Sequence, residues 1–278
     1  MRVTWLAVLV ACKVPAIDLA GKSCPCVAGY QCDTATNTCV PPGSDAPIDT
    51  ASDAGAMYRD VVLADSPIGY WRLGDIGAIA RDELGLHDGM YSGSCTQGVA
   101  GAIAGDANTA VTFDGGSCKV TMPVAFAFAG TAAFSVEAWV QTTANTQFQM
   151  VLSDETRNAT NPIDGYALLV VPIANGGGPS LERVISQAGV KTPVGLLGAG
   201  FEHVVATYDG AHVALYVNGA FSGQAADARA ANTITQVAII GAASVGNYFA
   251  GTLDEVALYG TALAADRIAA HHQAGAGP

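Results

Sequence analysis

Seven cysteines carry the most recognisable chemistry in this 278-residue chain, because cysteines can form disulfides or bind a metal. Four of them crowd together in the order C-x-C-x5-C-x6-C: Cys24, Cys26, Cys32 and Cys39. Zinc sites are typically built from C-x-x-C pairs, and no histidine falls inside this cluster, so two disulfides are predicted in preference to zinc. A bridge between Cys24 and Cys26 would be strained, so each is expected to pair with Cys32 or Cys39, and both patterns stay open.

The three other cysteines have different contexts. Cys95 and Cys118 flank a predicted strand pair, and we expect a disulfide between them that ties the rim of the large domain together. Cys12 follows an apolar N-terminal run, and Leu9-Val10-Ala11-Cys12 resembles the lipobox of bacterial lipoproteins. That resemblance implies that residues 1–11 are a signal peptide and that Cys12 becomes a lipidated N-terminus. The alternative is ordinary signal cleavage and a secreted protein.

The carboxylates do not match a hydrolase pattern. Glycosidases use two carboxylates placed roughly 5 to 10 Å apart across the bond that they cut. Glu137 is the only acid on its predicted strand, and Asp254 and Glu255 are adjacent, so we expect them to point to opposite faces. The chain has no G-x-S-x-G motif either. We therefore predict that the protein is not an enzyme.

The histidines are interpreted as structural. His203 and His212 stand at the starts of predicted strands, where a hydrogen-bonded histidine is the default. His271 and His272 lie in a predicted helix and are expected on its surface, not at a metal.

Composition excludes some partners. The net charge is −12, from 12 basic and 24 acidic residues, and the basic residues form no cluster. Nucleic acid and anionic membrane surfaces both require such a cluster, so neither is an expected partner. The acidity leaves room for calcium, although it also serves solubility.

Four segments are predicted along the chain. The signal peptide (1–11) is followed by a short disulfide-rich module (12–40), which is too small to have its own core. Residues 41–57 are rich in Pro, Ala, Ser and Asp, and we expect a flexible acidic linker there. Residues 58–278 form the large domain.

The large domain alternates apolar and polar residues in short runs separated by glycine turns. In the run FSVEAWV, Phe134, Val136, Ala138 and Val140 share one face, whereas Ser135, Glu137 and Trp139 share the other. About a dozen such strands predict an all-β jelly-roll sandwich. One helix is predicted over Ala264–His272 and ends before Gly275. Ala264 has no side-chain acceptor to cap that helix, so the helix must rely on the packing of Leu263 and Ile268 for its stability.

Several blocks resemble the concanavalin A-like, laminin G-type domain of bacterial surface proteins. They are YWRLGD, AVTFDGGSCKV, FSVEAWV, FEHVVATYDGAHVALYVNG and YFAGTLDEVALYGTALAADRIAAHHQAG, between about Tyr58 and Gly275. The resemblance implies the sandwich fold, but it does not specify a ligand, because members of this family bind sugars, proteins or nothing known. It also implies one calcium ion at the rim, with Asp82 and Asp254 as candidate ligands. The alternative is that Asp82 caps a turn and Asp254 begins a strand.

One pair of residues raises the question of sugar binding directly. Glu137 and Trp139 share a strand face, and a flat tryptophan ring beside a polar group can stack on a sugar. Packing is the favoured role of Trp139, because its strand is standard in the family.

The order of anchor, spacer and sandwich predicts an extracytoplasmic binding module. We expect it at the bacterial outer membrane or cell surface through the lipid on Cys12, or secreted if Cys12 is not lipidated. The expected partner is a glycan or a cell-surface protein. The alternatives are a structural or assembly component of the cell envelope, and a polysaccharide hydrolase.

Overall fold

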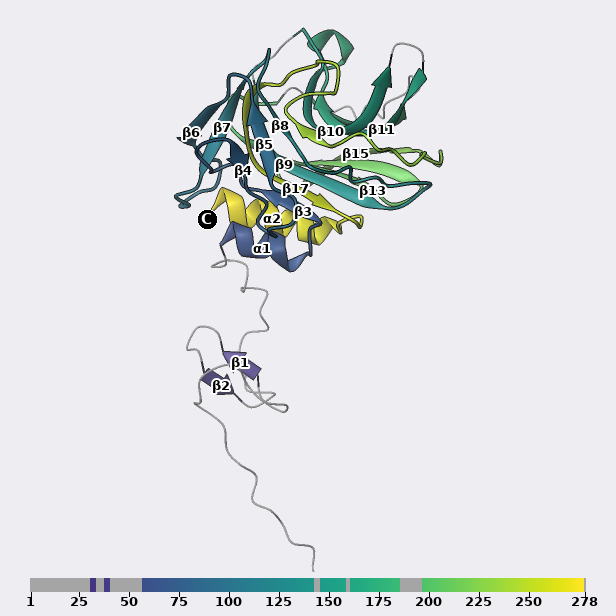
Figure 1. Cartoon of the computed structure of the whole chain (residues 1–278). Helices are drawn as coiled ribbons and strands as arrows, with labels where there is room; N and C mark the ends of the chain where they lie inside the picture. The colour runs from purple at the N-terminus through teal and green to yellow at the C-terminus, as the bar shows by residue number, and fades with distance from the viewer. Residues whose placement is uncertain are drawn as a thin grey trace, which may run out of the picture. The chain divides into compact units, whose positions relative to one another are not determined.

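The structure is a computed structural model (Figure 1), and it describes residues 31–33, 38–40, 57–142, 146–158, 161–185 and 197–277. The chain divides into two compact units, Met1–Ser52 and Asp53–Pro278. In the first, β1 (Gln31–Asp33) pairs antiparallel with β2 (Thr38–Val40). The predicted signal peptide, the linker, Cys12 and the side chains of Cys24, Cys26, Cys32 and Cys39 lie outside the part that the structure describes.

The second unit is a sandwich of two antiparallel sheets, as the sequence predicts. One sheet has eight strands in the order β15-β14-β13-β9-β17-β7-β6, with β3 added beside β17. They are β3 (Gly69–Trp71), β6 (Thr96–Ala100), β7 (Thr109–Asp114), β9 (Phe134–Thr142), β13 (Glu202–Tyr208), β14 (His212–Val217), β15 (Ala220–Ala226) and β17 (Ala250–Tyr259).

The other sheet has seven strands in the order β12-β11-β10-β16-β8-β5-β4. They are β4 (Ile79–Ala80), β5 (Gly89–Ser92), β8 (Lys119–Thr121), β10 (Gln149–Asn158), β11 (Asn161–Val170), β12 (Pro179–Ile185) and β16 (Ile239–Ile240). A short 3-10 helix, η1 (Ile173–Asn175), follows β11.

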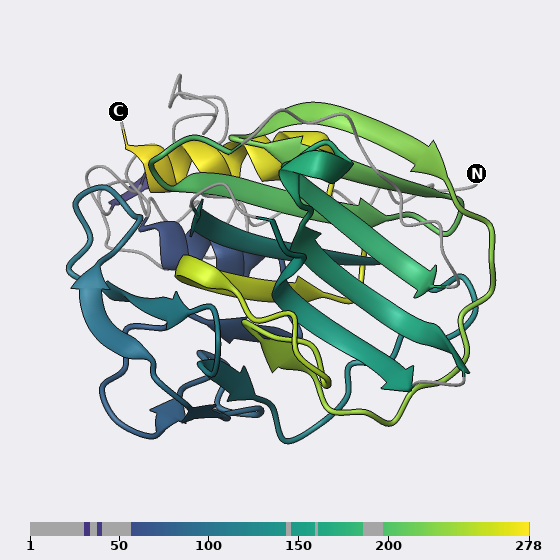
Figure 2. The same ribbon diagram turned by 90° about the horizontal axis from the view of Figure 1, so that it is seen from above.

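Two helices, α1 (Tyr58–Ala64) and α2 (Ala265–Ala276), cover the outer face of the eight-stranded sheet (Figures 1 and 2). That sheet therefore has two buried faces. One packs against the seven-stranded sheet, and its side chains include Val136, Ala138, Val140 and Leu253. The other packs against the helices through Trp139, Tyr259, Tyr58 and Ile268. The alternation predicted for β9 is confirmed, and it assigns Glu137 and Trp139 to the helix side.

The helices differ most from the sequence prediction. Helix α1 was not predicted, because it has only seven residues and Met57 provides no side-chain cap. Helix α2 extends through Ala276, and Gly275 lies inside it. Gly275 is needed for packing and does not end the helix, since a Cβ there would lie only 2.4 Å from Cζ2 of Trp139. Ala264 gives no cap, as expected, whereas Leu263 and Ile268 are buried. No helix in the described ranges is long and apolar enough to span a membrane.

A bulge in β17 overturns one prediction. Asp254 lies opposite Trp139, but Ala257 lies opposite Glu137, so β17 has one residue more than β9 in this interval. The backbone of Glu255 adopts φ +53° there. The bulge interrupts the alternation, so Glu255 shares the helix side with Asp254 instead of pointing to the opposite face.

Candidate functional site

Asp82 holds a turn together. It forms a β-bridge with Trp71, and its carboxylate accepts hydrogen bonds from four backbone N–H groups. The donors are Tyr70 at 3.0 Å, Leu84 at 3.2 Å, Leu86 at 3.2 Å and His87 at 3.0 Å. This arrangement matches the turn-capping alternative considered for Asp82.

Asp254 is buried at the bulge. One carboxylate oxygen, Oδ2, accepts a hydrogen bond of 2.7 Å from the Ala102 N–H. Burial, together with the neighbouring Glu255, raises the pKa of Asp254 to about 8. Asp82 and Asp254 therefore have separate protein partners. In the part of the chain that the structure describes, no three His, Cys, Asp or Glu side chains are grouped to hold a metal ion. Calcium binding stays a prediction.

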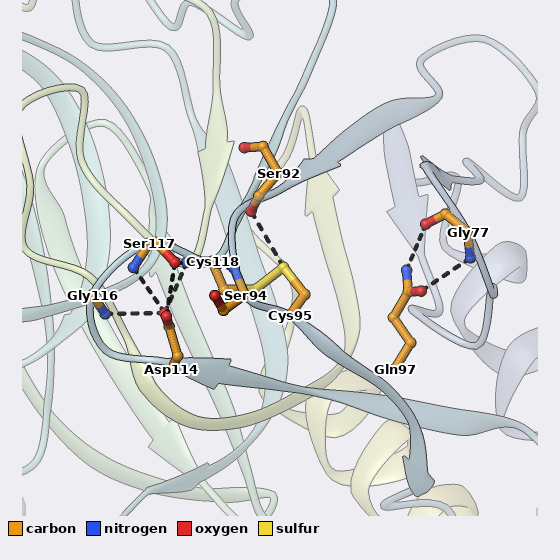
Figure 3. The surroundings of a disulfide bond; sticks show 9 residues. All are labelled: Gly77, Ser92, Ser94, Cys95, Gln97, Asp114, Gly116, Ser117 and Cys118. Carbon is orange, nitrogen blue, oxygen red and sulfur yellow. Dashed lines mark hydrogen bonds between the residues drawn. A yellow bond between two sulfur atoms is a disulfide. The ribbon is translucent and has the colours of Figure 1, made fainter.

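The disulfide between Cys95 and Cys118 is present, with Cα atoms 4.9 Å apart (Figure 3). Cys95 precedes β6 and Cys118 precedes β8, so the bond links the two sheets at one corner of the sandwich. Beside it, the carboxylate of Asp114 accepts hydrogen bonds from the N–H groups of Gly116, Ser117 and Cys118. These bonds lower the pKa of Asp114 and close the turn between β7 and β8.

The densest group of titratable side chains is centred on Glu137. Its carboxylate accepts hydrogen bonds from the hydroxyls of Tyr58 and Tyr259, both at 2.7 Å. It also contacts Nε2 of His203 at 2.7 Å and Nδ1 of His271 at 2.9 Å. These five residues come from α1, β9, β13, β17 and α2, so the whole fold is needed to assemble them.

His271 joins this group to the end of α1. Its Nε2 lies 2.7 Å from a carboxylate oxygen of Asp65. The prediction that His271 lies on the helix surface is wrong, because its side chain is fully buried. Burial disfavours the charged imidazole, but Glu137 and Asp65 raise the pKa of His271 to about 9. Although burial opposes its ionisation, the two histidines hold the pKa of Glu137 well below its ordinary value.

A second buried group surrounds Glu255. The guanidinium of Arg72 donates three hydrogen bonds to Glu255, at 2.7, 2.9 and 3.2 Å, and one to Asp106 at 2.6 Å. Tyr70 donates its hydroxyl proton to the same Glu255 carboxylate. Burial raises the pKa of Glu255 to about 7, although the hydrogen bonds and positive charge of Arg72 favour the ionised carboxylate and act to lower it.

Trp139 is also sealed beneath the helices. It is 3% exposed and its ring packs against His203, His272 and Tyr58. The packing interpretation of Trp139 therefore agrees with the structure, and a sugar ring has no access to it. The carboxylates of Glu137 and Glu255 on this face are buried and hold helices and loops in place, while Asp65, Arg72 and Asp106, at the edges of the two groups, have side chains that are 12 to 19% exposed.

Another region, at one end of the sandwich, has exposed and partly exposed side chains. Three loops meet there, and we call residues 114–118, 171–178 and 241–249 the glycine rim. The Gly115 N–H donates to the Phe249 carbonyl at 2.9 Å, and the Met150 N–H donates to the Asn247 carbonyl at 3.1 Å. Val171 and Ala243 pack with Met150 in one apolar cluster. Consecutive glycines with positive φ, Gly176 to Gly178, allow the tight turn after η1.

The glycine rim exposes apolar and amide side chains. Val245 is 68% exposed and Ile173 is 51% exposed. Asn247 and Tyr248 are partly exposed beside Val245. Asp114 is the only charged residue in these three loops, and its carboxylate is occupied by backbone N–H groups. The glycine rim was not predicted from the sequence; the run GAASVGNYFAG was the available signal.

Comparisons with known proteins agree with this fold. The family model described as the concanavalin A-like lectin/glucanases superfamily, Laminin_G_3, matches residues 114–269. Domain 4 of the extracellular arabinanase AbnA from Geobacillus stearothermophilus, solved with arabinotriose, is 19% identical with a TM-score of 0.52. That match covers 74% of this chain and 97% of the domain.

Larger proteins contain a similar domain. Trypanosoma rangeli sialidase is 12% identical with a TM-score of 0.51, over 73% of this chain and 32% of the sialidase. The receptor-binding domain of botulinum neurotoxin C/D mosaic serotype is 11% identical with a TM-score of 0.52, over 75% of this chain and 51% of that domain. The comparison with curated proteins gave no match. Because the family model covers more than half of the chain, this protein belongs to the concanavalin A-like lectin/glucanases superfamily.

Proposed function

We propose that this protein is a carbohydrate-binding module whose glycine rim binds a neutral glycan. The observation that carries the proposal is the contrast between two regions. The carboxylates of Glu137 and Glu255 are buried, whereas in the glycine rim Val245 is exposed and Asn247 and Tyr248 are partly exposed.

The chemistry of the glycine rim suits a sugar. Binding sites for small ligands combine apolar and aromatic surface with a few polar groups that fix orientation. Tyr248 is a partly exposed aromatic residue, and Asn247 is a partly exposed amide. The absence of any Lys or Arg from the three loops disfavours sialylated or sulfated glycans, which need a cation.

The comparisons support this proposal at the level of fold. The arabinanase domain, which was solved with arabinotriose, is matched over almost its whole length. A complete small domain of this shape can therefore hold an oligosaccharide, although identity of 19% does not transfer the site.

Export is the second part of the proposal. The lipobox-like segment before Cys12 supports a lipid-anchored protein at the bacterial outer membrane or cell surface. Calcium is not required by the proposal, since Asp82 and Asp254 already have protein partners. The comparison of glycan binding in calcium and in EDTA measures the effect of calcium directly.

A glycan array tests the function, with arabinan, xylan and glucan oligosaccharides beside sialylated and sulfated ones, each in calcium and in EDTA. We expect binding to neutral members, and titration calorimetry should then show at least about a tenfold loss of affinity for Tyr248→Ala. Leu86→Ala, which truncates an exposed side chain in the turn held by Asp82, is the control and should bind normally.

Three results would count against the proposal. Binding to no glycan in either condition would favour an assembly component of the envelope. Binding that survives Tyr248→Ala and Asn247→Ala unchanged would move the site away from the glycine rim. Release of reducing ends from a bound polysaccharide would favour the hydrolase alternative.

A further inference from the structure

A short segment of the chain between β8 and β9, residues 125–129, lies outside the strands of both sheets, and we call it the strap. Its sequence is AFAFA. Phe126 is buried in the core between the sheets, and Phe128 packs against the same core. The Phe126 ring contacts Trp71 and His87 edge-on, with ring centres 5.8 and 5.0 Å apart. Because the strap joins no strand ladder, the backbone groups of the buried Phe126 need other hydrogen-bond partners.

The residues on both sides of the strap are fixed by backbone contacts. The Val124 carbonyl accepts a hydrogen bond of 3.1 Å from the Ala238 N–H. Gly130 exchanges two hydrogen bonds with Ala231, both at 2.8 Å. The strap therefore has two fixed ends, and its middle can move only if the contacts of Phe126 open.

A row of three polar side chains on the seven-stranded sheet holds the strap. Asp154, Tyr166 and Arg183 are aligned in register across β10, β11 and β12. The Asp154 carboxylate accepts a hydrogen bond from the Phe126 N–H. The Tyr166 hydroxyl donates to the Phe126 carbonyl at 3.2 Å, and the Arg183 guanidinium donates to the Gly130 carbonyl at 2.7 Å. Both backbone groups of Phe126 are thus bound by neighbouring members of one row.

Asp154 is the member of this row with an unsatisfied atom. Its side chain is fully buried, and its Oδ1 atom has no hydrogen-bond partner, whereas Oδ2 is occupied by the strap N–H. An ionised carboxylate is costly to bury unless it is paired. A protonated Asp154 avoids that cost, and it can still accept the strap N–H through Oδ2.

Among the described side chains, those around Asp154 do not supply a positive partner. Glu155 is the adjacent acid and opposes the ionisation of Asp154. Tyr166 stays neutral, because burial raises its pKa well above its ordinary value. Arg183 is already paired with Asp227 at 3.2 Å. Burial therefore dominates and raises the pKa of Asp154 to about 7, although the strap N–H favours the ionised form.

We propose that Asp154 is a pH-sensitive switch for the strap, which is closed while Asp154 carries its proton and opens when the proton leaves. Opening lets water reach the carboxylate and withdraws Phe126 from the core. The change is confined to a few residues, because Val124 and Gly130 keep their own backbone contacts. This inference does not depend on the glycan proposal.

The direction of the pH effect follows from the two states of Asp154. Its pKa is raised to about 7 under the closed strap, compared with about 3.9 for a carboxyl in water, as in the open state. The closed state therefore binds the proton more tightly. Closure is fully favoured below about pH 4, becomes weaker as pH rises, and reaches a constant level above about pH 7.

Hydrogen–deuterium exchange on the full chain, measured from pH 4.5 to 7.5 and corrected for the intrinsic pH dependence of exchange, tests the switch. Protection of residues 125–129 should fall at least about tenfold over this range. Residues 134–142, which form the central strand β9, should stay protected throughout. Independently of any substitution, the carboxyl carbon signal of Asp154 in NMR should titrate near pH 7.

Two variants separate the switch from the other contacts of the strap. In Asp154→Asn the side chain keeps an acceptor but cannot ionise, so protection of the strap should change by less than about twofold between pH 4.5 and 7.5. Asp254, Glu255 and His271 still titrate in this variant, so the difference from wild type isolates Asp154. Tyr166→Phe removes the bond to the Phe126 carbonyl and should lower protection at every pH while keeping the wild-type pH dependence.

Asp164→Asn is the matched control, because it neutralises an acid of β11 whose exposed hydrogen bond is to Asn232 and not to the strap. It should keep the wild-type pH dependence. Protection of the strap that does not change with pH in wild type would overturn the proposal. The same conclusion would follow from an equal fall in Asp154→Asn, or from an Asp154 carboxyl signal that titrates near pH 4.

Discussion

His271 contacts the carboxylate of Glu137 through Nδ1 at 2.9 Å, although 134 residues separate them in the sequence. The contact joins the last helix to the central strand β9. With Asp65 on the other imidazole nitrogen, it also ties in the end of α1. The contacts of His271 with Glu137 and Asp65 therefore hold both helices against the eight-stranded sheet.

Removing the charge of Glu137 should destabilise the protein strongly. In Glu137→Gln, His271 keeps its buried position but loses one of the two negative partners that stabilise its charge. Breaking a buried ion pair from one side costs about 3 to 5 kcal/mol. Urea unfolding should show this loss, whereas Asp60→Asn at an exposed position should change the free energy of unfolding by less than about 0.5 kcal/mol. A small effect in Glu137→Gln would contradict the charged state assigned to His271.

Stability should fall as the solution becomes alkaline. The pKa of His271 is raised to about 9 in the folded protein, compared with about 6.5 in an unfolded chain. The folded state therefore binds this proton more tightly. The stabilisation is complete below about pH 6.5 and is lost as pH rises through 9. The free energy of unfolding, measured from pH 6 to 10, should fall less steeply in His271→Gln than in wild type. His212→Gln, at an exposed histidine, should keep the wild-type slope.

Gly275→Ala should destabilise the domain even though alanine favours a helix. The new Cβ would lie 2.4 Å from Cζ2 of Trp139 and 3.0 Å from Cδ2 of Tyr58. Overpacking of this kind costs roughly 1 to 3 kcal/mol. Gly260→Ala is a suitable control, because its Cβ would lie 3.7 Å from Cγ2 of Ile68, which is an ordinary van der Waals contact. Equal thermal melts for the two variants would show that α2 can move away from Trp139.

A cap on α2 should stabilise the protein. Ala264 occupies the N-cap position and makes no side-chain hydrogen bond. Ala264→Ser gives the first turn an acceptor, which is worth about 0.5 to 2 kcal/mol. Ala265→Ser, one residue into the helix, should instead cost a few tenths of a kcal/mol through helix propensity. The sign of the change in the free energy of unfolding, measured by chemical denaturation for each variant, distinguishes a capping effect from a general effect of serine.

Features that depend on local residue patterns could be predicted from the sequence. The alternation in FSVEAWV predicted both faces of β9, including the shared side of Glu137 and Trp139. Asp209-Gly210 and Asn218-Gly219 lie between β13, β14 and β15, and such residue pairs are hairpin signals in the sequence because they favour the required backbone conformations. The disulfide of Cys95 and Cys118 followed from cysteine count and an exported context.

Contacts between residues that are far apart in the sequence became visible only in the tertiary structure. Adjacent residues in a regular strand alternate, so the sequence placed Asp254 and Glu255 on opposite faces, whereas the bulge at Glu255 brings both to the helix side. The sequence does not distinguish His271 from His272, because no local signal marks which side of α2 faces Glu137. The glycine rim likewise unites loops that lie far apart along the chain. Such sites depend on long-range packing, which periodicity within a short window does not contain.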